Sequence, residues 1–212
     1  MTTTLLFARH GETADNTNRV FQGQHGTGLA PRGRTQAQRL ALRMRTAGLN
    51  AIVASDLERA AETARILGAA TELVPAFDRD LREIDVGAWS GKSYEEIQKM
   101  FPEEWAAWST GKDIARGGGE TYAAIAERVA RAVSRIVASH EGERVLVVSH
   151  GGAIRSYVAK ILGVLGAQGM RALSGLGNAS LTVIEVASEH AVLRTWNDTA
   201  HLEGLAVNDR AD

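Results

Sequence analysis

Two short apolar runs in this chain each lead to a histidine that glycine follows. Residues 4–8 precede Arg9 and His10. Residues 144–149 precede His150. Continuous apolar runs of this length are typical of parallel strands buried on both faces. Because ligands of open α/β sheets bind beyond the carboxyl ends of such strands, the sequence predicts a small-anion site that contains both histidines.

Strand-like and helix-like patterns alternate along the chain. This alternation predicts a layered α/β fold, here a three-layer α/β/α sandwich with a mostly parallel central sheet. No linker or repeat interrupts the pattern, so residues 1–212 are expected to form a single domain. Further strands are predicted at 51–55, 72–74, 180–186 and 191–196, the last two as a hairpin across 188–190, and helices at 31–47, 57–69, 93–101, 103–110, 119–139 and 152–162.

The charge and hydropathy of the chain argue against two classes of partner. The formal net charge is -1, so the chain lacks the strong positive field that favours binding to nucleic acid or to an anionic membrane surface. Its apolar runs are shorter than the roughly 20 residues of a membrane-spanning helix, and residues 1–8 lack the pattern of a signal peptide. We therefore expect a cytoplasmic protein without nucleic-acid or membrane partners.

The amino-acid composition also limits the chemistry. The chain has no cysteine, which excludes disulfides, thiolate zinc sites and cysteine nucleophiles. Its six histidines show no spacing typical of metal ligands. The sequence therefore predicts a site without a metal.

Two other charged residues stand in contexts that suggest a site. Arg59 lies in the first turn of a predicted helix, where the helix dipole favours an anion. Glu83 lies in segment 81–91, where acidic and apolar residues alternate. Each has an ordinary alternative: Arg59 as a solvated side chain, and Glu83 in a surface ion pair with Arg79 or Arg82. A histidine after a strand is likewise often structural, so the grouping at several strand ends is the informative feature.

Several segments of the chain resemble one known family, in the order that the family has them. They are LLFARHGETADN from residue 5, SDLERAAETA from residue 55, LREIDVGAWSG from residue 81, GGGET from residue 117 and VLVVSHGG from residue 145. Together they resemble the histidine phosphatase superfamily, also called phosphoglycerate mutase-like, from about residue 4 to about residue 200. The resemblance implies the phosphoglycerate mutase-like α/β fold and a homodimer.

The resemblance also implies a catalytic role for five residues. His10 is the expected nucleophile, which forms a phosphohistidine. Glu83 is the expected general acid, which then activates water. Arg9, Arg59 and His150 are expected to surround the phosphoryl group and to stabilise its charge in the transition state. This reaction needs no metal and no cofactor.

The resemblance further implies several binding residues. Asn16 aligns with a phosphate-contacting asparagine, and Gln22, Gly23 and Gly151 are expected to face the pocket. Arg116, beside three glycines, is the best candidate to bind a second anionic group of the substrate.

Several nearby polar residues are expected to have smaller roles. His25 is expected to be exposed, His201 to be structural, and Asn178 to support the loop of His150. Arg19, Tyr94, Trp105 and Trp108 are candidates to line the mouth of the pocket, although core packing of the short helices is the preferred interpretation for the two tryptophans. Ala30 replaces the usual threonine of the family and removes a helix-capping hydroxyl.

The resemblance also indicates a region, here residues 89–118, whose length differs between members of the family. Mutases carry an insertion between the general-acid segment and the glycine-rich segment, whereas a short stretch separates Trp89 from Gly117 here. We therefore predict a hydrolase of small phosphomonoesters. Residues 176–201 resemble glucosyl-3-phosphoglycerate phosphatases, which favours a sugar or glycerate phosphate. The alternatives are a cofactor-dependent phosphoglycerate mutase, a non-catalytic binding protein on this fold, and a phosphoprotein phosphatase.

Overall fold

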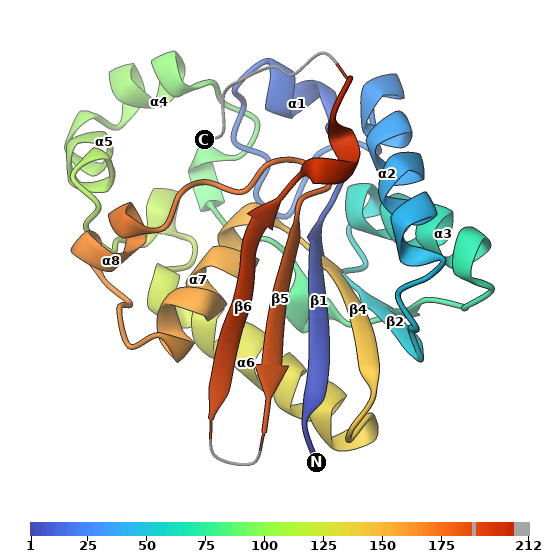
Figure 1. Ribbon diagram of the computed structural model, residues 1–212. Helices are drawn as coiled ribbons and strands as arrows, with labels where there is room; N and C mark the ends of the chain where they lie inside the picture. Colours follow the sequence, from blue (N-terminus) through green and yellow to red (C-terminus); the bar gives the residue numbers. More distant parts are fainter. Residues whose placement is uncertain (188–189, 206–212) are drawn as a thin grey trace.

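The chain folds around a central six-stranded sheet with the order β3-β2-β4-β1-β5-β6 (Figure 1). The computed structural model describes residues 1–187 and 190–205. Neighbouring strands from β3 to β1 pair in parallel, and β5 runs antiparallel to β1 and β6. The predicted mostly parallel sheet is therefore confirmed. The strands are β1 (Thr3–Arg9), β2 (Ala51–Ala54), β3 (Ala76–Phe77), β4 (Arg144–Ser149), β5 (Leu181–Val186) and β6 (Ala191–Asp198).

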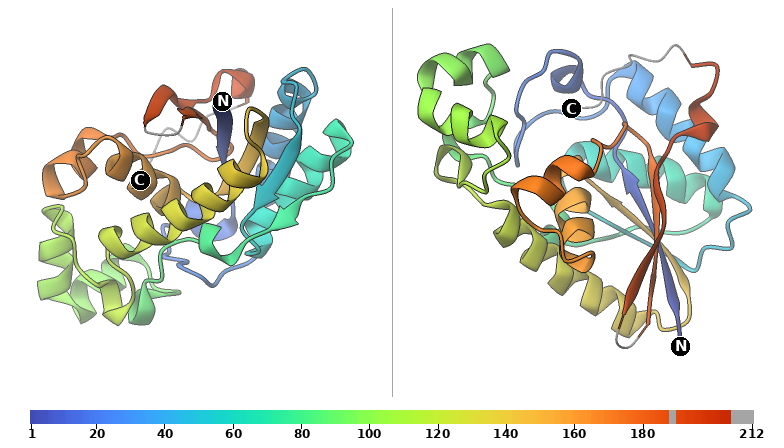
Figure 2. Two further views of the ribbon diagram at one scale, coloured as in Figure 1. Left: turned by 90° about the horizontal axis from the view of Figure 1, so that it is seen from below. Right: turned by 60° about the vertical axis from the view of Figure 1, so that its left-hand side comes forward.

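Helices cover both faces of the sheet and make the predicted three layers (Figure 2). Side chains of a strand alternate between the two faces. Leu5 and Phe7 of β1 accordingly belong to one core cluster, with α6 (Tyr122–Ser139) and α7 (Gly151–Ile161). Leu6 and Ala8 belong to a second cluster, with α2 (Pro31–Met44) and α3 (Glu58–Thr71). The side chains on both faces of β1 are buried, as its continuous apolar run predicts.

Short helices extend the fold beyond the carboxyl ends of β1 and β4, which lie toward the top of Figure 1. Aromatic side chains pack together here: the ring of Phe21, from the loop between α1 and α2, stacks on that of Tyr94 at 4.7 Å, and the rings of Trp105 and Trp108 lie 5.1 Å apart. Both tryptophans pack against the core cluster that contains α6, as expected, and Trp108 also lines a pocket, together with Arg19 and Tyr94. The remaining helical elements are α1 (Ala14–Thr17), η1 (Arg79–Leu81), η2 (Gly87–Trp89), α4 (Tyr94–Met100), α5 (Pro102–Ser109), η3 (Arg116–Gly118), α8 (Ala167–Ala172) and η4 (Ala200–Leu202).

The strand predicted at 72–74 is wrong. Helix α3 runs on to Thr71, and Glu72 ends it in the left-handed conformation, with a φ of 60°. The next residues complete this turn, because the N–H of Leu73 donates to the carbonyl of Gly68. The short strand therefore begins only at Ala76, which pairs with Val53 of β2. By contrast, the predicted hairpin of β5 and β6 is confirmed, although part of its turn, 188–189, lies outside the described residues.

The start of helix α2 lacks a side-chain cap. Ala30 is the N-cap residue, with extended backbone and no side-chain hydrogen bond. A hydroxyl at this position accepts a hydrogen bond from an otherwise unpaired N–H of the first turn.

Replacing Ala30 should therefore change stability in a way that depends on the hydroxyl. Threonine and valine are nearly isosteric, so the pair isolates the hydrogen bond. We expect Ala30→Thr to exceed Ala30→Val by about 1 kcal/mol in free energy of unfolding, measured by urea denaturation. Equal stability of the two variants would show that this cap contributes nothing.

Candidate active site

A pocket opens beyond the carboxyl ends of β1 and β4, and most of the predicted site residues line it. His150 is the exception: it is fully buried, and its ring lies 5.1 Å from that of His10, at 58° to it. The predicted residues that line the pocket are Arg9, His10, Asn16, Gln22, Gly23, Arg59, Glu83, Arg116 and Gly151.

The side chain of His10 is held in one tautomer. Its Nδ1 lies 2.7 Å from the carbonyl oxygen of Gly11. Because a carbonyl can only accept, Nδ1 carries the proton and Nε2 keeps a free lone pair. Burial lowers the pKa of His10 well below its usual 6.5, and the charges of Arg59 and Arg9 lower it further. His10 is therefore a neutral imidazole with an unprotonated Nε2.

His150 has a different set of contacts. Its Nε2 lies 2.8 Å from the hydroxyl of Ser55, which follows β2. Among the described residues, its buried Nδ1 has no hydrogen-bond partner. Burial lowers the pKa of His150 well below 6.5, with Arg59 as the next cause. A neutral His150 can offer a hydrogen bond at Nδ1 when the Ser55 hydroxyl donates to Nε2.

Two buried arginines complete the base of the pocket. Arg59 is 2% exposed. One of its terminal nitrogens donates to the carbonyl of His25 and the other to the carbonyl of Gly23, both at 2.7 Å. Burial lowers its pKa to about 10. One terminal nitrogen of Arg9 donates to the carbonyl of Leu176. Within the described part of the chain, neither arginine pairs with a carboxylate, and the Nε of each is unpartnered. Buried cations without a counter-ion indicate a site for an anion.

The loop between α1 and α2 shapes one wall of the pocket. Gly23 has a φ of 55°, and a Cβ there would lie 2.7 Å from the side chain of Val86, so glycine is required at this position. Its backbone carbonyl accepts a hydrogen bond from Arg59. Gln22 is buried, and its Oε1 has no hydrogen-bond partner among the residues described. His25 is exposed, as expected.

Asn16 is anchored by its oxygen. Its Oδ1 accepts from the backbone N–H of Thr13 at 3.1 Å and from Asn178 at 3.1 Å. These contacts leave the amide NH₂ of Asn16 as the group that can donate to a ligand. Asn178 also donates to the carbonyl of His10 at 3.2 Å. The expectation that Asn178 supports the loop of His150 is therefore wrong: β5 is the neighbour of β1, so the segment before β5 reaches the loop of His10.

Glu83 is held at the start of helix α7. Its Oε2 accepts from the N–H of Gly152 and its Oε1 from that of Ala153, both at 3.0 Å. A Cβ on Gly152 would lie 2.5 Å from Oε1, so glycine leaves room for the carboxylate. The alternative surface ion pair with Arg82 is not formed, because Arg82 pairs with Asp56 at 2.6 Å.

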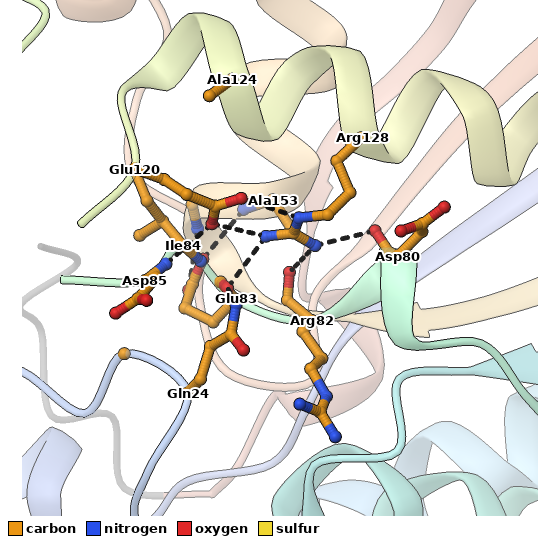
Figure 3. Close-up of polar contacts among 12 residues, drawn as sticks. Gln24, Asp80, Arg82, Glu83, Ile84, Asp85, Glu120, Ala124, Arg128 and Ala153 are labelled. Atoms are coloured by element: carbon orange, nitrogen blue, oxygen red, sulfur yellow. Dashed lines mark hydrogen bonds and ion pairs between the residues drawn. The ribbon is translucent and has the colours of Figure 1, made fainter. Parts of the chain in front are cut away.

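Arg128 of α6, which the sequence did not single out, holds the segment that carries Glu83 (Figure 3). Its guanidinium donates to three backbone carbonyls, those of Asp80, Arg82 and Glu83, at 2.9, 3.0 and 3.2 Å. It also pairs with Glu120, which accepts from the N–H of Asp85. Burial raises the pKa of Glu120, but Arg128 and the N–H of Asp85, with a smaller contribution from the charge of Arg116, together lower it below its usual value. Glu120, in the glycine-rich segment GGGET, thus links that segment to the backbone that carries Glu83.

The comparison with known proteins now decides the family. The model of the histidine phosphatase superfamily (branch 1) matches residues 5–199. The chain belongs to this superfamily. A glucosyl-3-phosphoglycerate phosphatase of Mycobacterium tuberculosis is 38% identical over 186 residues, which cover 84% of this chain and 83% of the relative. A metal-independent phosphoserine phosphatase of Arabidopsis thaliana is 32% identical over 213 residues, which cover 98% of this chain and 87% of the relative.

A solved structure shows the same fold. Bacillus stearothermophilus YhfR superposes with a TM-score of 0.89 at 34% identity, and the match covers 95% of this chain and 100% of the other. The phosphoglycerate mutase-like α/β fold predicted from the sequence is therefore confirmed.

Other features of this histidine phosphatase lie outside the base of the pocket. His201 contacts the carbonyl of Ala179 at 3.0 Å and does not line the pocket, in keeping with a structural role. Arg155 of α7 and Tyr122 line the pocket together with Arg116. The sequence did not predict a pocket position for Arg155 or Tyr122. Among the described residues, no cluster of three or more histidine, aspartate or glutamate side chains is arranged to hold a metal ion.

The lowered pKa of both buried histidines has a measurable consequence. As the pH falls through 6.5, an ordinary histidine takes up a proton, but His10 and His150 stay neutral until much lower pH. We expect their ring NMR signals to stay unchanged from about pH 8 to about pH 6, while those of a reference peptide titrate.

The same shift predicts lower stability in acid. Between the folded-state pKa and 6.5 the unfolded chain binds more protons than the folded one, so the free energy of unfolding falls as the pH drops below about 6.5. A His10 signal that titrates with a midpoint near 6.5 would contradict the neutral, buried imidazole.

Proposed function

We propose that this histidine phosphatase hydrolyses small phosphomonoesters through a phosphohistidine on His10. The observation that carries the proposal is the neutral His10, which has a free Nε2 and lines one pocket with Arg9 and Arg59, two buried arginines that form no ion pair with any described residue. A neutral imidazole is a competent nucleophile, and the two cations supply the charge that a phosphoryl group needs.

The reaction proceeds in two steps. First, Nε2 of His10 attacks phosphorus, the bond from phosphorus to the ester oxygen breaks, and Glu83 gives a proton to the leaving oxygen. Second, water attacks phosphorus, the phosphorus–nitrogen bond breaks, and Glu83 takes a proton from the water. His10 and Glu83 return to their starting states, and the products are an alcohol and phosphate.

The other site residues stabilise the transferring phosphoryl group. Arg9 and Arg59 bind its equatorial oxygens, and His150 donates a hydrogen bond from Nδ1. Asn16 donates through its amide, since its oxygen is already occupied. The other proposed binding residues lie around this group: Gln22 and Gly23 on the wall of the pocket, and Gly151 at the first position of α7.

The substrate is proposed to be a sugar or glycerate phosphate. The names of the two relatives, a glucosyl-3-phosphoglycerate phosphatase and a phosphoserine phosphatase, support a small phosphorylated metabolite. Arg116 lines the outer part of the pocket, where it suits a second anionic group.

Two alternatives receive less support from the structure. A mutase has to protect its phosphohistidine from water, whereas only the short helices α4 and α5 lie between Trp89 and the glycine-rich segment that begins at Gly117. A non-catalytic binding protein would need no nucleophile or acid, yet both His10 and Glu83 line the pocket.

The organisation of the protein is proposed on the same basis. We propose one histidine phosphatase domain for residues 1–212, of which residues 5–199 match the family. A cytoplasmic location is proposed from the composition and hydropathy of the chain, and a homodimer from the family resemblance alone. In the described ranges, no helix has the length and hydropathy to cross a membrane.

The nucleophile can be tested by trapping. Incubation with a ³²P-labelled phosphomonoester, followed by a quench without acid, should leave label on His10 that acid removes and base does not. His10→Ala should lose both the label and turnover, whereas His25→Ala, at an exposed histidine, should keep both. Unchanged turnover of His10→Ala would overturn the proposal. Conversion of 3- to 2-phosphoglycerate without release of phosphate would instead favour the mutase.

The proton donor can be tested through the leaving group. Alkoxides are poor leaving groups and need a proton, whereas nitrophenolate leaves without one. We therefore expect Glu83→Gln to slow alkyl phosphates by about a hundredfold or more and nitrophenyl phosphate far less, as measured by phosphate release. Equal slowing of both substrates would show that Glu83 is not the acid.

A further inference from the structure

The outer pocket holds a second pair of arginines that the phosphoryl chemistry does not use. Arg116 and Arg155 both line the pocket with Tyr122. They come from separate elements, η3 and α7, so the fold brings them to one wall. Neither forms an ion pair with any residue that the structure describes.

Arg116 is nearly buried and incompletely satisfied. It is 5% exposed, and its guanidinium lies 4.4 Å from the centre of the Tyr122 ring. Its Nε and one terminal nitrogen, Nη2, find no hydrogen-bond partner in the described ranges. Leaving such donors unpaired in a buried position is costly unless a ligand binds them.

Arg155 adds a second unsatisfied cation beside the first. Its buried Nε also has no partner within the described chain. Burial lowers the pKa of Arg155, and the charge of Arg116 lowers it further. Two mutually repelling guanidinium groups are stabilised by an anion between them.

The acidic residues near this wall are already occupied. Glu120 pairs with Arg128, and Glu104 accepts from the N–H of Gly117 at 2.8 Å. Asp113 accepts from the N–H of Tyr122 and, at 3.0 Å, from that of Ala123. Among the described residues, no carboxylate lies within ion-pair distance of Arg116 or Arg155, so a bound anion can still approach both guanidinium groups directly.

We infer that Arg116 and Arg155 bind a carboxylate on the leaving group, so that the substrates are phosphomonoesters of short hydroxy acids. The inference rests on the proposed phosphatase function. The planar guanidinium matches a carboxylate with two parallel hydrogen bonds. A carboxylate also carries one charge, so placing it beside Tyr122 and Val86 costs less desolvation than placing a phosphate dianion there.

Helix α7 connects the proposed proton donor and the second arginine pair. Glu83, the proposed donor to the ester oxygen, is bound at the N–H of Gly152, and Arg155 follows three residues later, nearly one turn along the helix. Both side chains line the same pocket, so we expect a compact leaving group, with its carboxylate one or two carbons from the ester carbon, to reach both.

Matched substrate pairs test the inference. The pairs are 3-phosphoglycerate with glycerol 3-phosphate, and O-phosphoserine with O-phosphoethanolamine, which differ chiefly in the carboxylate. We expect kcat/KM to be about tenfold or more higher for the acid of each pair. A third pair, propane-1,3-diol bisphosphate with its monophosphate, measures any preference for a second phosphate.

Substitutions then assign the preference to the two arginines. Arg155→Gln should bring the acid-to-neutral ratio to within about threefold of one, chiefly by raising KM for the acid, and Arg155→Lys should restore part of it. Arg116→Gln should act in the same direction. The matched control is Arg131→Gln, which removes an exposed charge from α6 and should leave the ratio as in the wild type. The ratio is measured within each variant, so a partial loss of folded protein does not alter it.

The outcomes separate the two proposals. Hydrolysis of every ester without preference for the acids, a larger preference for the bisphosphate, or an unchanged ratio in Arg155→Gln would overturn the outer carboxylate site alone. Failure of the wild type to release phosphate from any of these esters or from nitrophenyl phosphate would overturn the phosphatase function and the inference with it.

Discussion

The parallel pairing of β1 with β4 is the constraint on which the site depends. The two strands are in register so that Arg9 lies opposite Ser149, and the N–H of His10 donates to the carbonyl of Ser149 at 3.0 Å. The parallel pairing and this hydrogen bond therefore place His10 and His150, which follow the two strands, at the same edge of the sheet. A shift by one residue would turn every side chain of β1 to the opposite face, which would exchange the side chains between the two core clusters and move Arg9 and His10 out of their present positions.

The pocket gathers positive charge on buried side chains, and this burial explains the lowered pKa values. Burial disfavours every charged form, so the pKa of His10, His150 and Arg59 all fall. Backbone carbonyls stabilise Arg59 without neutralising it, because they carry only partial charge. The folded protein thus keeps a cationic, neutral-imidazole site that a phosphate dianion complements. Such preorganised charge is costly for stability and effective for binding.

The sequence predicts the parts of the site that follow buried strands. Apolar runs locate His10 and His150 because strands buried on both faces have a distinct pattern. It does not predict Arg128 or Arg155, since an arginine within a helix usually faces solvent and nothing local marks its partners. Arg128 binds carbonyls 45 to 48 residues away in the chain. Asn178 was assigned to the wrong loop for the same reason: the neighbour of β1 in the sheet is known only once the strand order is known.

Helix α7 joins the parts of the mechanism into one rigid element. His150 is its N-cap residue, the N–H groups of its first turn bind Glu83, and Arg155 follows within the next turn. The orientation of the partner histidine, the acid and the outer cation is therefore set by a single helix packed on the core. Because Arg155 projects from the far end of this array, changing it alters recognition of the leaving group while the first turn keeps its geometry. This separation gives a physical reason why one phosphoryl site can serve different leaving groups within a family.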